Sequence, residues 1–486
     1  MKGGQVIAAL GFILIAFGTI ILSPITVALI EHEPEAIAPF VWASAIAISL
    51  GFLCRKMGGG RTNFDRLKRN EGMLIVCLAW LSAAAVTAIP YLFFGLSPLD
   101  AYFEAMSGIT TTGATILLDF SGYPRCFFFW RSLSQWLGGM GIIVLFVAIL
   151  PQFKVAGRQL FFAEAPGPTE ERVTPRITQT AKALWFVYVS LTLLEIGALV
   201  WAGMGPFDAV CNSLSTMAAG GFSPNPASIM GYGSDRICWI ITVFMFLAGA
   251  NFASQYWAFV RRRPRVLFGS EEFRGYLAII VAAGGGVSAA LLATTDASGV
   301  VALRDGYFQI VSLLTTTGFA TADFARWAVP CQVILFSVML VGGCAGSAGG
   351  GIKVVRILFC AKYIRREIVK IIHPRLVMPI KIDRKTVPEA IQQQILGFLL
   401  FYLLVLIAST LVVTAIEHDL VVGIVGTAAT LGNIGPGYGE IGPMASFGTL
   451  VWPTKLIFIF NMVVGRLEII PFLAMLHPDF WYLSKH

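Results

Sequence analysis

Long apolar stretches separated by short polar connections dominate this 486-residue chain. A membrane-crossing helix needs about 20 apolar residues, and ten stretches approach or exceed that length. They cover residues 5–23, 37–54, 74–95, 128–150, 183–203, 237–260, 276–295, 331–360, 396–416 and 452–476. The first resembles a signal sequence, but no small-residue cleavage site follows, so we expect a retained helix. The pattern predicts an all-α polytopic membrane protein.

Four further apolar stretches are too short to cross a membrane, and they follow the third, fifth, seventh and ninth spans. Each begins at an aspartate and reaches a glycine 13 residues later. The four pairs are Asp100 and Gly113, Asp208 and Gly221, Asp305 and Gly318, and Asp419 and Gly432. This recurrence predicts a fourfold internal repeat in which each unit contains a span, a half-helix capped by its aspartate, an unwound loop and a second span.

The end of each short stretch predicts non-helical backbone inside the membrane. A helix of about 12 residues rises about 18 Å and enters only part of the bilayer. The first stretch ends in GITTTGATIL, from Gly108 to Leu117, and threonine and glycine are poor helix-interior residues. One such loop is explained by a re-entrant turn or a glycine kink. Four in register favour a pore lined by peptide carbonyls and helix C-termini, which suits a dehydrated cation.

Composition and charge support a membrane protein. Hydrophobic residues make up 57% of the chain and charged residues 13%, whereas soluble domains carry about 25% charged residues. The net charge of +8 does not indicate nucleic-acid binding, because Lys and Arg cluster in the loops around 55–69, 154–182, 261–274 and 353–385. These loops alternate with acidic or nearly neutral ones, which is the positive-inside pattern. We therefore expect a multi-pass membrane protein with both termini in the cytoplasm.

The polar residues do not suggest an enzyme. The eight cysteines form no CxxC pair, and the five histidines are scattered along the chain. No catalytic grouping or phosphate-binding loop accompanies them. The sequence therefore predicts transport without catalysis.

The repeated short stretches resemble those of the Trk/Ktr/HKT superfamily of potassium and sodium transporters, over residues 70–480. Two extra N-terminal spans are similar to TrkH-type members rather than the shorter KtrB type. The resemblance implies one pore built from four non-identical channel-like repeats, each with the order helix, pore helix, filter and helix. The expected divisions are 1–70 for two N-terminal helices and a basic loop, 71–153 for repeat one, 154–265 for repeat two with its preceding cytosolic loop, 266–370 for repeat three with a glycine-rich loop, and 371–486 for repeat four.

The resemblance also implies that four filter segments bind the transported potassium ion. These are Thr111, Thr112, Gly113 and Ala114; Ala219, Gly220, Gly221 and Phe222; Thr316, Thr317, Gly318 and Phe319; and Leu431, Gly432 and Asn433. Sodium-preferring relatives often carry serine in place of the first glycine, so Gly113 favours potassium. Gly220 and Gly221 compete for the key position in repeat two, and the spacing favours Gly221. The short stretches of repeats one and three end in the same four residues, TTTG, whereas those of repeats two and four do not. The filter is therefore not fourfold identical, and strict potassium selectivity is not implied.

A glycine-rich segment interrupts the second span of repeat three. Residues 342–351 read GGCAGSAGGG and are followed by Lys353. Six glycines in ten residues do not hold a stable helix in lipid. The segment is either a close-packing kink or a loop that blocks ions beneath the filter. The resemblance implies the latter, with Gly346, Gly349, Gly350 and Lys353 in the gate.

Arg466 is the second unusual feature, because it lies inside the last apolar span in NMVVGRLEII. A buried arginine in lipid costs at least ~2.5 kcal/mol, so it has to face protein or a wet cavity. One alternative is a structural bridge to a carboxylate, although Glu468 is not on the same helix face. We expect Arg466 to project into the pore below the filter and to hinder cations, a role that the resemblance also implies.

These features predict gated, channel-like potassium uptake. The alternative is a proton- or sodium-coupled potassium symporter, for which Glu104, Glu195 and Glu468 are the candidate intramembrane carboxylates. The basic loops 154–182 and 361–395 either contact lipid or, as the resemblance implies, dock a cytosolic TrkA-type nucleotide-binding regulatory subunit. The resemblance further implies a homodimer with one pore per protomer.

Overall fold

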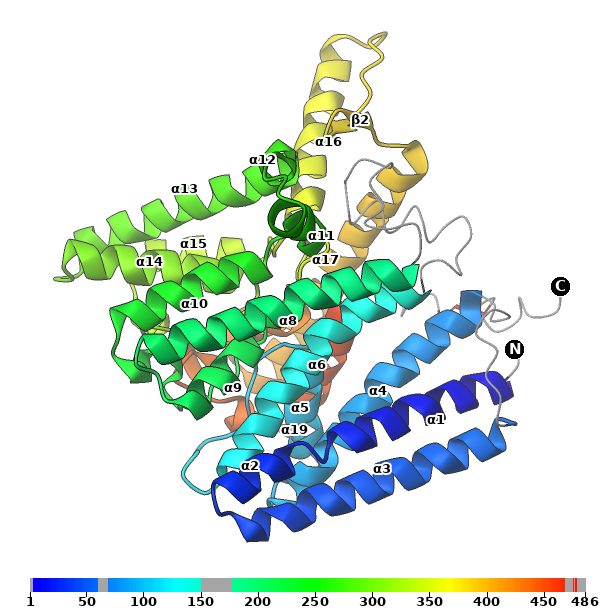
Figure 1. Ribbon diagram of the computed structural model, residues 1–486. Helices are drawn as coiled ribbons and strands as arrows, with labels where there is room; N and C mark the ends of the chain where they lie inside the picture. Colours follow the sequence, from blue (N-terminus) through cyan, green and yellow to red (C-terminus); the bar gives the residue numbers. More distant parts are fainter. Residues whose placement is uncertain (1–2, 60–68, 150–176, 468–474, 476, 479–486) are drawn as a thin grey trace.

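The computed structural model describes residues 3–59, 69–149, 177–467, 475, 477 and 478, and Figure 1 shows their arrangement. Within these residues the chain is almost entirely helical. One antiparallel hairpin interrupts the helices, formed by β1 (Lys381–Ile382) and β2 (Lys385–Thr386). The predicted all-α fold is confirmed.

The N-terminal helices pack along the first repeat. α1 (Gly3–Ile20) and α3 (Ile37–Met57) lie side by side, and both contact α4 (Arg69–Phe93). α2 (Pro24–Ile30) continues from α1 and packs against α6 (Arg125–Ile149). These helices therefore form a layer outside repeat one.

Each repeat contains a long first helix, a short helix and a returning second helix. Their elements are α4, α5 (Pro98–Ile109) and α6; α8 (Ile177–Trp201), α9 (Pro206–Met217) and α10 (Asp235–Ala248); α13 (Glu271–Thr294), α14 (Gly299–Leu314) and α15 (Val329–Met339); and α17 (Glu389–Glu417), the helical stretch 420–431 that ends in α18 (Thr427–Leu431), and α19 (Trp452–Arg466). The second helices of repeats one and two pack on the short helix of the next repeat, α6 on α9 and α10 on α14. Since α19 likewise packs on α5, the fourth repeat meets the first.

Two of the expected spans are broken in the part of the chain that the structure describes. Six helices within the described ranges are long and apolar enough to cross a membrane. A bent pair, Asp235–Ala248 and Phe252–Val260, adds a seventh if it is one span, with an angle of 105° between its parts. The expected span 331–360 is divided between α15 and α16 (Val354–Ile372). Six glycines in residues 342–351 explain the break between α15 and α16. At the other break Gly249 ends α10, and the Asn251 side chain caps the next helical turn by accepting from the amide of Ser254.

The aspartates of the short helices do not share one helix position. Only Asp419 begins its helix, where Oδ1 accepts hydrogen bonds from the amides of Val421 and Val422 at 2.6 and 3.1 Å. Asp100 and Asp208 lie in the first turns of α5 and α9, whose caps are Ser97 and Gly205. Asp305 lies inside α14, which begins after Ser298. The expectation that every short helix starts at its aspartate is therefore wrong for three repeats.

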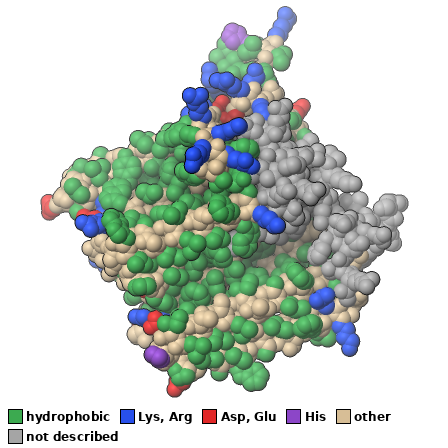
Figure 2. All heavy atoms as spheres, viewed as in Figure 1, with side chains coloured by type: hydrophobic (Ala, Val, Ile, Leu, Met, Phe, Trp, Pro, Cys, Tyr) green, Lys and Arg blue, Asp and Glu red, His purple; other side chains and the backbone are tan. Residues whose placement is uncertain are grey.

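Figure 2 shows a broad band of hydrophobic side chains across one face of the molecule, with Lys and Arg gathered around α16 and α12 (Arg265–Gly269). α13 packs against α16, and the ammonium of Lys362 pairs with the carboxylate of Glu271. The basic clusters at 261–274 and 353–385 thus lie at one end of the fold. Residues 60–68 and 150–176, which hold much of the other two clusters, lie outside the described residues.

Candidate functional site

Each short helix ends in the same backbone motif. The residue after its cap has left-handed φ, and the following amide bonds to a carbonyl five residues earlier, which is the Schellman geometry. The left-handed residues are Thr111, Ala219, Thr316 and Asn433, with φ of 54, 54, 59 and 54°. The closing amide-to-carbonyl bonds are Thr112 to Ser107, Gly220 to Ser215, Thr317 to Ser312 and Ile434 to Ala429, at 2.8, 2.9, 2.8 and 2.8 Å. A side chain in this region costs about 1–2 kcal/mol, so the surrounding contacts must hold the shape.

This motif corrects the expected register of repeat four. Leu431 is the last helical residue of α18, and Gly432 is its C-cap with φ of −78°. Asn433 follows with left-handed φ, so Gly435 rather than Gly432 is the counterpart of Gly113. The 13-residue spacing misled because Asp419 begins its helix whereas Asp100 lies a few residues inside α5. We refer to residues 111–113, 219–221, 316–318 and 433–435 as the central loops.

Four glycines allow neighbouring central loops to pack closely, because they have no side chain. Gly113, Gly221, Gly318 and Gly435 all have positive φ, of 81, 78, 83 and 101°. A Cβ on these glycines would lie 2.1, 2.0, 2.1 and 2.7 Å from the carbonyl oxygens of Gly220, Thr317, Ile434 and Thr112, respectively. Each oxygen belongs to the residue just before the glycine of the next repeat. The four contacts therefore form a closed ring, and in repeat two Gly221 rather than Gly220 takes the glycine position.

Polar side chains hold neighbouring central loops together. Asn433 Nδ2 donates to Thr112 Oγ1 and to the carbonyl of Met462, both at 3.0 Å, and so joins repeats four and one. Gln135 Nε2 donates to the carbonyl of Gly220 at 2.6 Å, and its Oε1 accepts from the amide of Phe222 at 3.0 Å. A helix of repeat one therefore fixes the loop of repeat two. Sequence reasoning missed Gln135 because its partners are 85 and 87 residues away.

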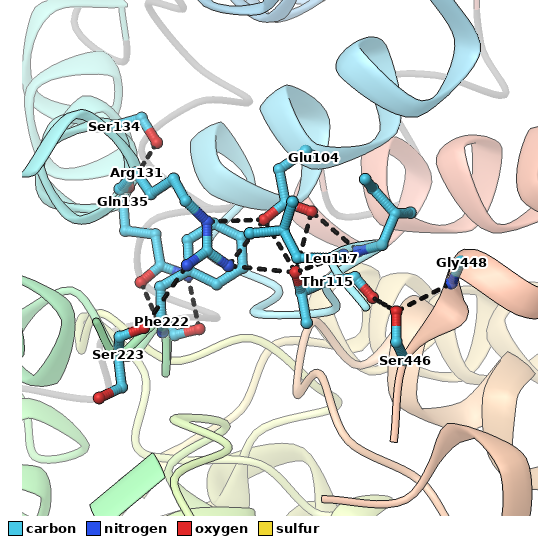
Figure 3. A network of polar contacts seen from close by, with 12 residues as sticks. Glu104, Thr115, Leu117, Arg131, Ser134, Gln135, Phe222, Ser223, Ser446 and Gly448 are labelled. Carbon is cyan, nitrogen blue, oxygen red and sulfur yellow. Dashed lines mark hydrogen bonds and ion pairs between the residues drawn. The ribbon is translucent and has the colours of Figure 1, made fainter. Parts of the chain in front are cut away.

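A buried ion pair lies beside the first two central loops, as Figure 3 shows. Glu104 of α5 and Arg131 of α6 are almost fully buried, with 2.7 Å between Oε1 and Nη2. The carboxylate also accepts from the Thr115 hydroxyl at 3.0 Å and the Ile116 amide at 2.9 Å. Glu104 was expected only as a candidate coupling carboxylate, and the structure places it in an ion pair.

The glycine-rich segment 342–351 lies against the ends of two short helices. The Gly350 amide donates to Thr316 Oγ1 at 2.8 Å, and a Cβ on Gly350 would lie 2.5 Å from the carbonyl oxygen of Gly432. A Cβ on Gly349 would lie 2.8 Å from the carbonyl oxygen of Thr315. The segment therefore packs directly against the caps that precede the third and fourth central loops.

The rest of this segment is fixed to repeat two and to α13. Asn251 Nδ2 donates to the Ala345 carbonyl at 2.7 Å, and the Phe252 amide donates to the Gly346 carbonyl at 3.1 Å. Lys353 is buried, has φ of +80° and precedes α16. The expected gate residues Gly346, Gly349, Gly350 and Lys353 thus belong to one non-helical segment.

Arg466 reaches the same segment from α19. Its Nη1 donates to the carbonyl of Ala348 at 3.0 Å, and Nη2 donates to the carbonyl of Gly138 at 3.4 Å. The side chain is buried, and its guanidinium lies 5.9 Å from the ring of Trp80. Among the described residues no carboxylate pairs with Arg466, and Glu468 lies outside them.

Comparison within the chain makes Arg466 an exception to the repeat. A Cβ on Gly138 would lie 1.9 Å from the carbonyl oxygen of Ile109, and one on Gly465 would lie 2.0 Å from that of Leu431. Ile109 and Leu431 are both the last residues of short helices, so Gly138 corresponds to Gly465. Repeat one therefore has a glycine, Gly139, where repeat four has Arg466.

Comparison with known proteins identifies relatives along nearly the whole chain. The family model described as TrkH, a cation transport protein, matches residues 32–283 and 295–479. The Trk system potassium uptake protein TrkH of Salmonella typhimurium is 38% identical over 97% of this chain and 98% of its own length. TrkG of Escherichia coli, also named a Trk system potassium uptake protein, is 32% identical over 97% of both chains. The crystal structure of the potassium transporter TrkH from Vibrio parahaemolyticus matches with a TM-score of 0.90 and 37% identity, covering 99% of this chain and 100% of that chain.

Proposed function

Since the chain belongs to the TrkH family of cation transport proteins, we propose that it takes up potassium through a gated, channel-like pore. The names of its full-length relatives support potassium as the transported ion. The single observation that carries the proposal is the closed ring of contacts through Gly113, Gly221, Gly318 and Gly435. Such a ring brings four short helix ends and their loops together, which is what a carbonyl-lined ion site requires.

In this proposal the central loops form the ion filter. Peptide oxygens of residues 111–113, 219–221, 316–318 and 433–435 replace water around a dehydrated potassium ion. The C-termini of four short helices add partial negative charge next to these loops. The left-handed residues of the caps support this role, because strained backbone persists where function requires it.

The glycine-rich segment and Arg466 form the gate. The contacts of Gly349 and Gly350 with the helix caps support a segment that obstructs ions below the filter. Arg466 stabilises this position through its bond to Ala348, and its charge raises the barrier to a cation. Opening of the gate would break the contacts of the glycine-rich segment with the helix caps and the bond between Arg466 and Ala348.

The alternative function is proton- or sodium-coupled potassium symport, and one carboxylate favours it. Glu195 of α8 is fully buried, and neither of its carboxylate oxygens has a hydrogen-bond partner among the described residues. An unpaired intramembrane carboxylate is a typical site for a coupled proton. Glu104 is less suited to that role because Arg131 already neutralises it.

The proposed uptake is tested by flux in liposomes that contain the purified protein. We expect potassium and rubidium to enter down an imposed gradient, and Gly221→Ala to abolish entry because its Cβ would overlap the carbonyl oxygen of Thr317. Gly197→Ala is the matched control, since a Cβ at Gly197 has no neighbour within 4 Å. Wild-type protein that passes no potassium, or Gly221→Ala with normal flux, would refute the proposal.

We also propose the assembly and membrane that the family resemblance implies, with the orientation that the charge pattern predicts. The chain forms a homodimer in the bacterial inner membrane with both termini in the cytoplasm, and a TrkA-type nucleotide-binding subunit docks on its basic loops. The shared basic end formed by α12 and α16 supports such a docking face (Figure 2). Light scattering measures the oligomer, and co-purification with and without the cytosolic subunit measures docking.

A further inference from the structure

The ion pair of Glu104 and Arg131 contacts the segment that follows the first central loop. Glu104 Oε1 accepts from Arg131 Nε at 2.8 Å, and Oε2 accepts from the Ile116 amide at 2.9 Å. Arg131 Nη2 also donates to the Thr115 hydroxyl at 3.1 Å. Thr115 and Ile116 lie two and three residues beyond Gly113, so the pair anchors the segment that follows this glycine.

The same arginine reaches the second central loop. Its guanidinium lies 4.0 Å from the ring centroid of Phe222, and Nη1 is 3.5 Å from the carbonyl oxygen of Ser223. Phe222 and Ser223 follow Gly221 directly. One guanidinium thus contacts the exit segments of two neighbouring loops, as the close-up in Figure 3 shows.

The other repeats have no ion pair at the positions that correspond to Glu104 within the described residues. Glu104 lies six residues before the C-cap of its helix, and the equivalent residues are Asn212, Gln309 and Gly426. Asn212 Nδ2 donates within its own repeat, to the carbonyl of Asp208 and the hydroxyl of Tyr232. Gln309 is fully buried, and neither amide atom of its side chain has a partner among the described residues. Within the described chain, an ion pair at this position therefore braces the loops of repeats one and two only.

We propose that Glu104 and Arg131 are positioning residues that set the spacing between the first two central loops and thereby determine discrimination between potassium and sodium. This inference rests on the proposed filter function. A smaller ion is excluded when the oxygens around it cannot move inward, so a rigid brace behind the loops favours the larger ion. The planar guanidinium suits this task because its several donors have fixed directions.

Arg131→Lys is the decisive variant. Lysine keeps the positive charge but cannot place donors on the carboxylate, Thr115 and Ser223 together. We expect potassium flux to persist while the potassium-to-sodium flux ratio falls about tenfold, because at least one charged hydrogen bond is lost. Glu104→Gln should lower the same ratio. Glu31→Gln is the matched control, since it removes the exposed pair between Glu31 and Arg125 on the same α6.

The readout is paired potassium and sodium flux in liposomes, together with thermal unfolding in each salt. Unfolding reports ion binding even where a variant transports poorly, and Arg131→Lys should lose most of the preferential stabilisation by potassium. An unchanged flux ratio and an unchanged salt preference in Arg131→Lys would overturn the positioning role. Wild-type protein that carries no potassium would instead overturn the proposed function on which it rests.

Discussion

Arg466 donates a 3.0 Å hydrogen bond to the backbone carbonyl of Ala348, across 118 residues of sequence. The bond joins the last helix of repeat four to the glycine-rich segment of repeat three. The guanidinium is buried, and one of its nitrogens, Nε, has no hydrogen-bond partner among the described residues. A buried charge held by two backbone carbonyls, one in the glycine-rich segment and one in α6, is costly, so this contact suits an element that rearranges.

The contact predicts that Arg466→Ala increases flux at rest. Removal of the charge and of the bond to Ala348 lowers the barrier, and a decrease of about 1.4 kcal/mol raises the rate about tenfold. The measurement compares potassium flux in the variant and the wild type under identical drive. Lys455→Ala is the control, because Lys455 lies in the first turn of α19 and pairs with Asp100 instead. Unchanged flux and selectivity in Arg466→Ala would exclude Arg466 from the mechanism.

A methyl group on Gly350 should also favour the open state. Its Cβ would lie 2.5 Å from the carbonyl oxygen of Gly432, so Gly350→Ala cannot keep the segment in place. We expect a higher potassium flux with little change in the potassium-to-sodium ratio, measured in liposomes. Gly285→Ala on α13 provides a comparison, since its Cβ would meet only the Tyr307 hydroxyl at 4.0 Å. A fall in flux would mean that the segment has to be close-packed for conduction.

The register of repeat four is tested by two alanine substitutions. Gly435→Ala introduces a Cβ at φ of +101° and 2.7 Å from the Thr112 oxygen, so we expect uptake to fall by about tenfold or more. Gly432→Ala should be better tolerated because its φ of −78° suits alanine, and the Ile434 side chain that its Cβ would meet at 2.9 Å can move. Growth of a potassium-uptake-deficient strain at limiting potassium compares the two. The reverse order of severity would restore the register that the aspartate spacing suggested.

Glu195→Gln separates the channel from the symporter. Glutamine has nearly the same shape but cannot bind and release a proton, so a channel should keep its potassium flux in this variant. We expect no proton movement with potassium in wild-type liposomes, as measured by an internal pH dye. Proton entry that accompanies potassium and disappears in Glu195→Gln would establish symport instead.

The sequence alone predicted the helical fold, the presence of four short helices and the ends of three of them. Apolar length and glycine content are local properties, so they located the short helices and the break at 342–351 and singled out Arg466. They also located Gly113, Gly221 and Gly318, because each of these glycines lies four residues beyond the end of its short helix. Family resemblance then supplied the expected fourfold pore.

Only the tertiary structure decided how these parts meet. In repeat four, Gly435 rather than Gly432 belongs to the ring because Asp419 caps its helix. The sequence shows an aspartate at this position but not whether that aspartate begins the helix or lies inside it. The partners of Arg131 and Arg466 and the bond from Asn433 to Thr112 join residues far apart in sequence, the last pair by 321 positions. Such contacts depend on the packing of whole helices, because local propensity contains no information on which distant carbonyl a buried donor will reach.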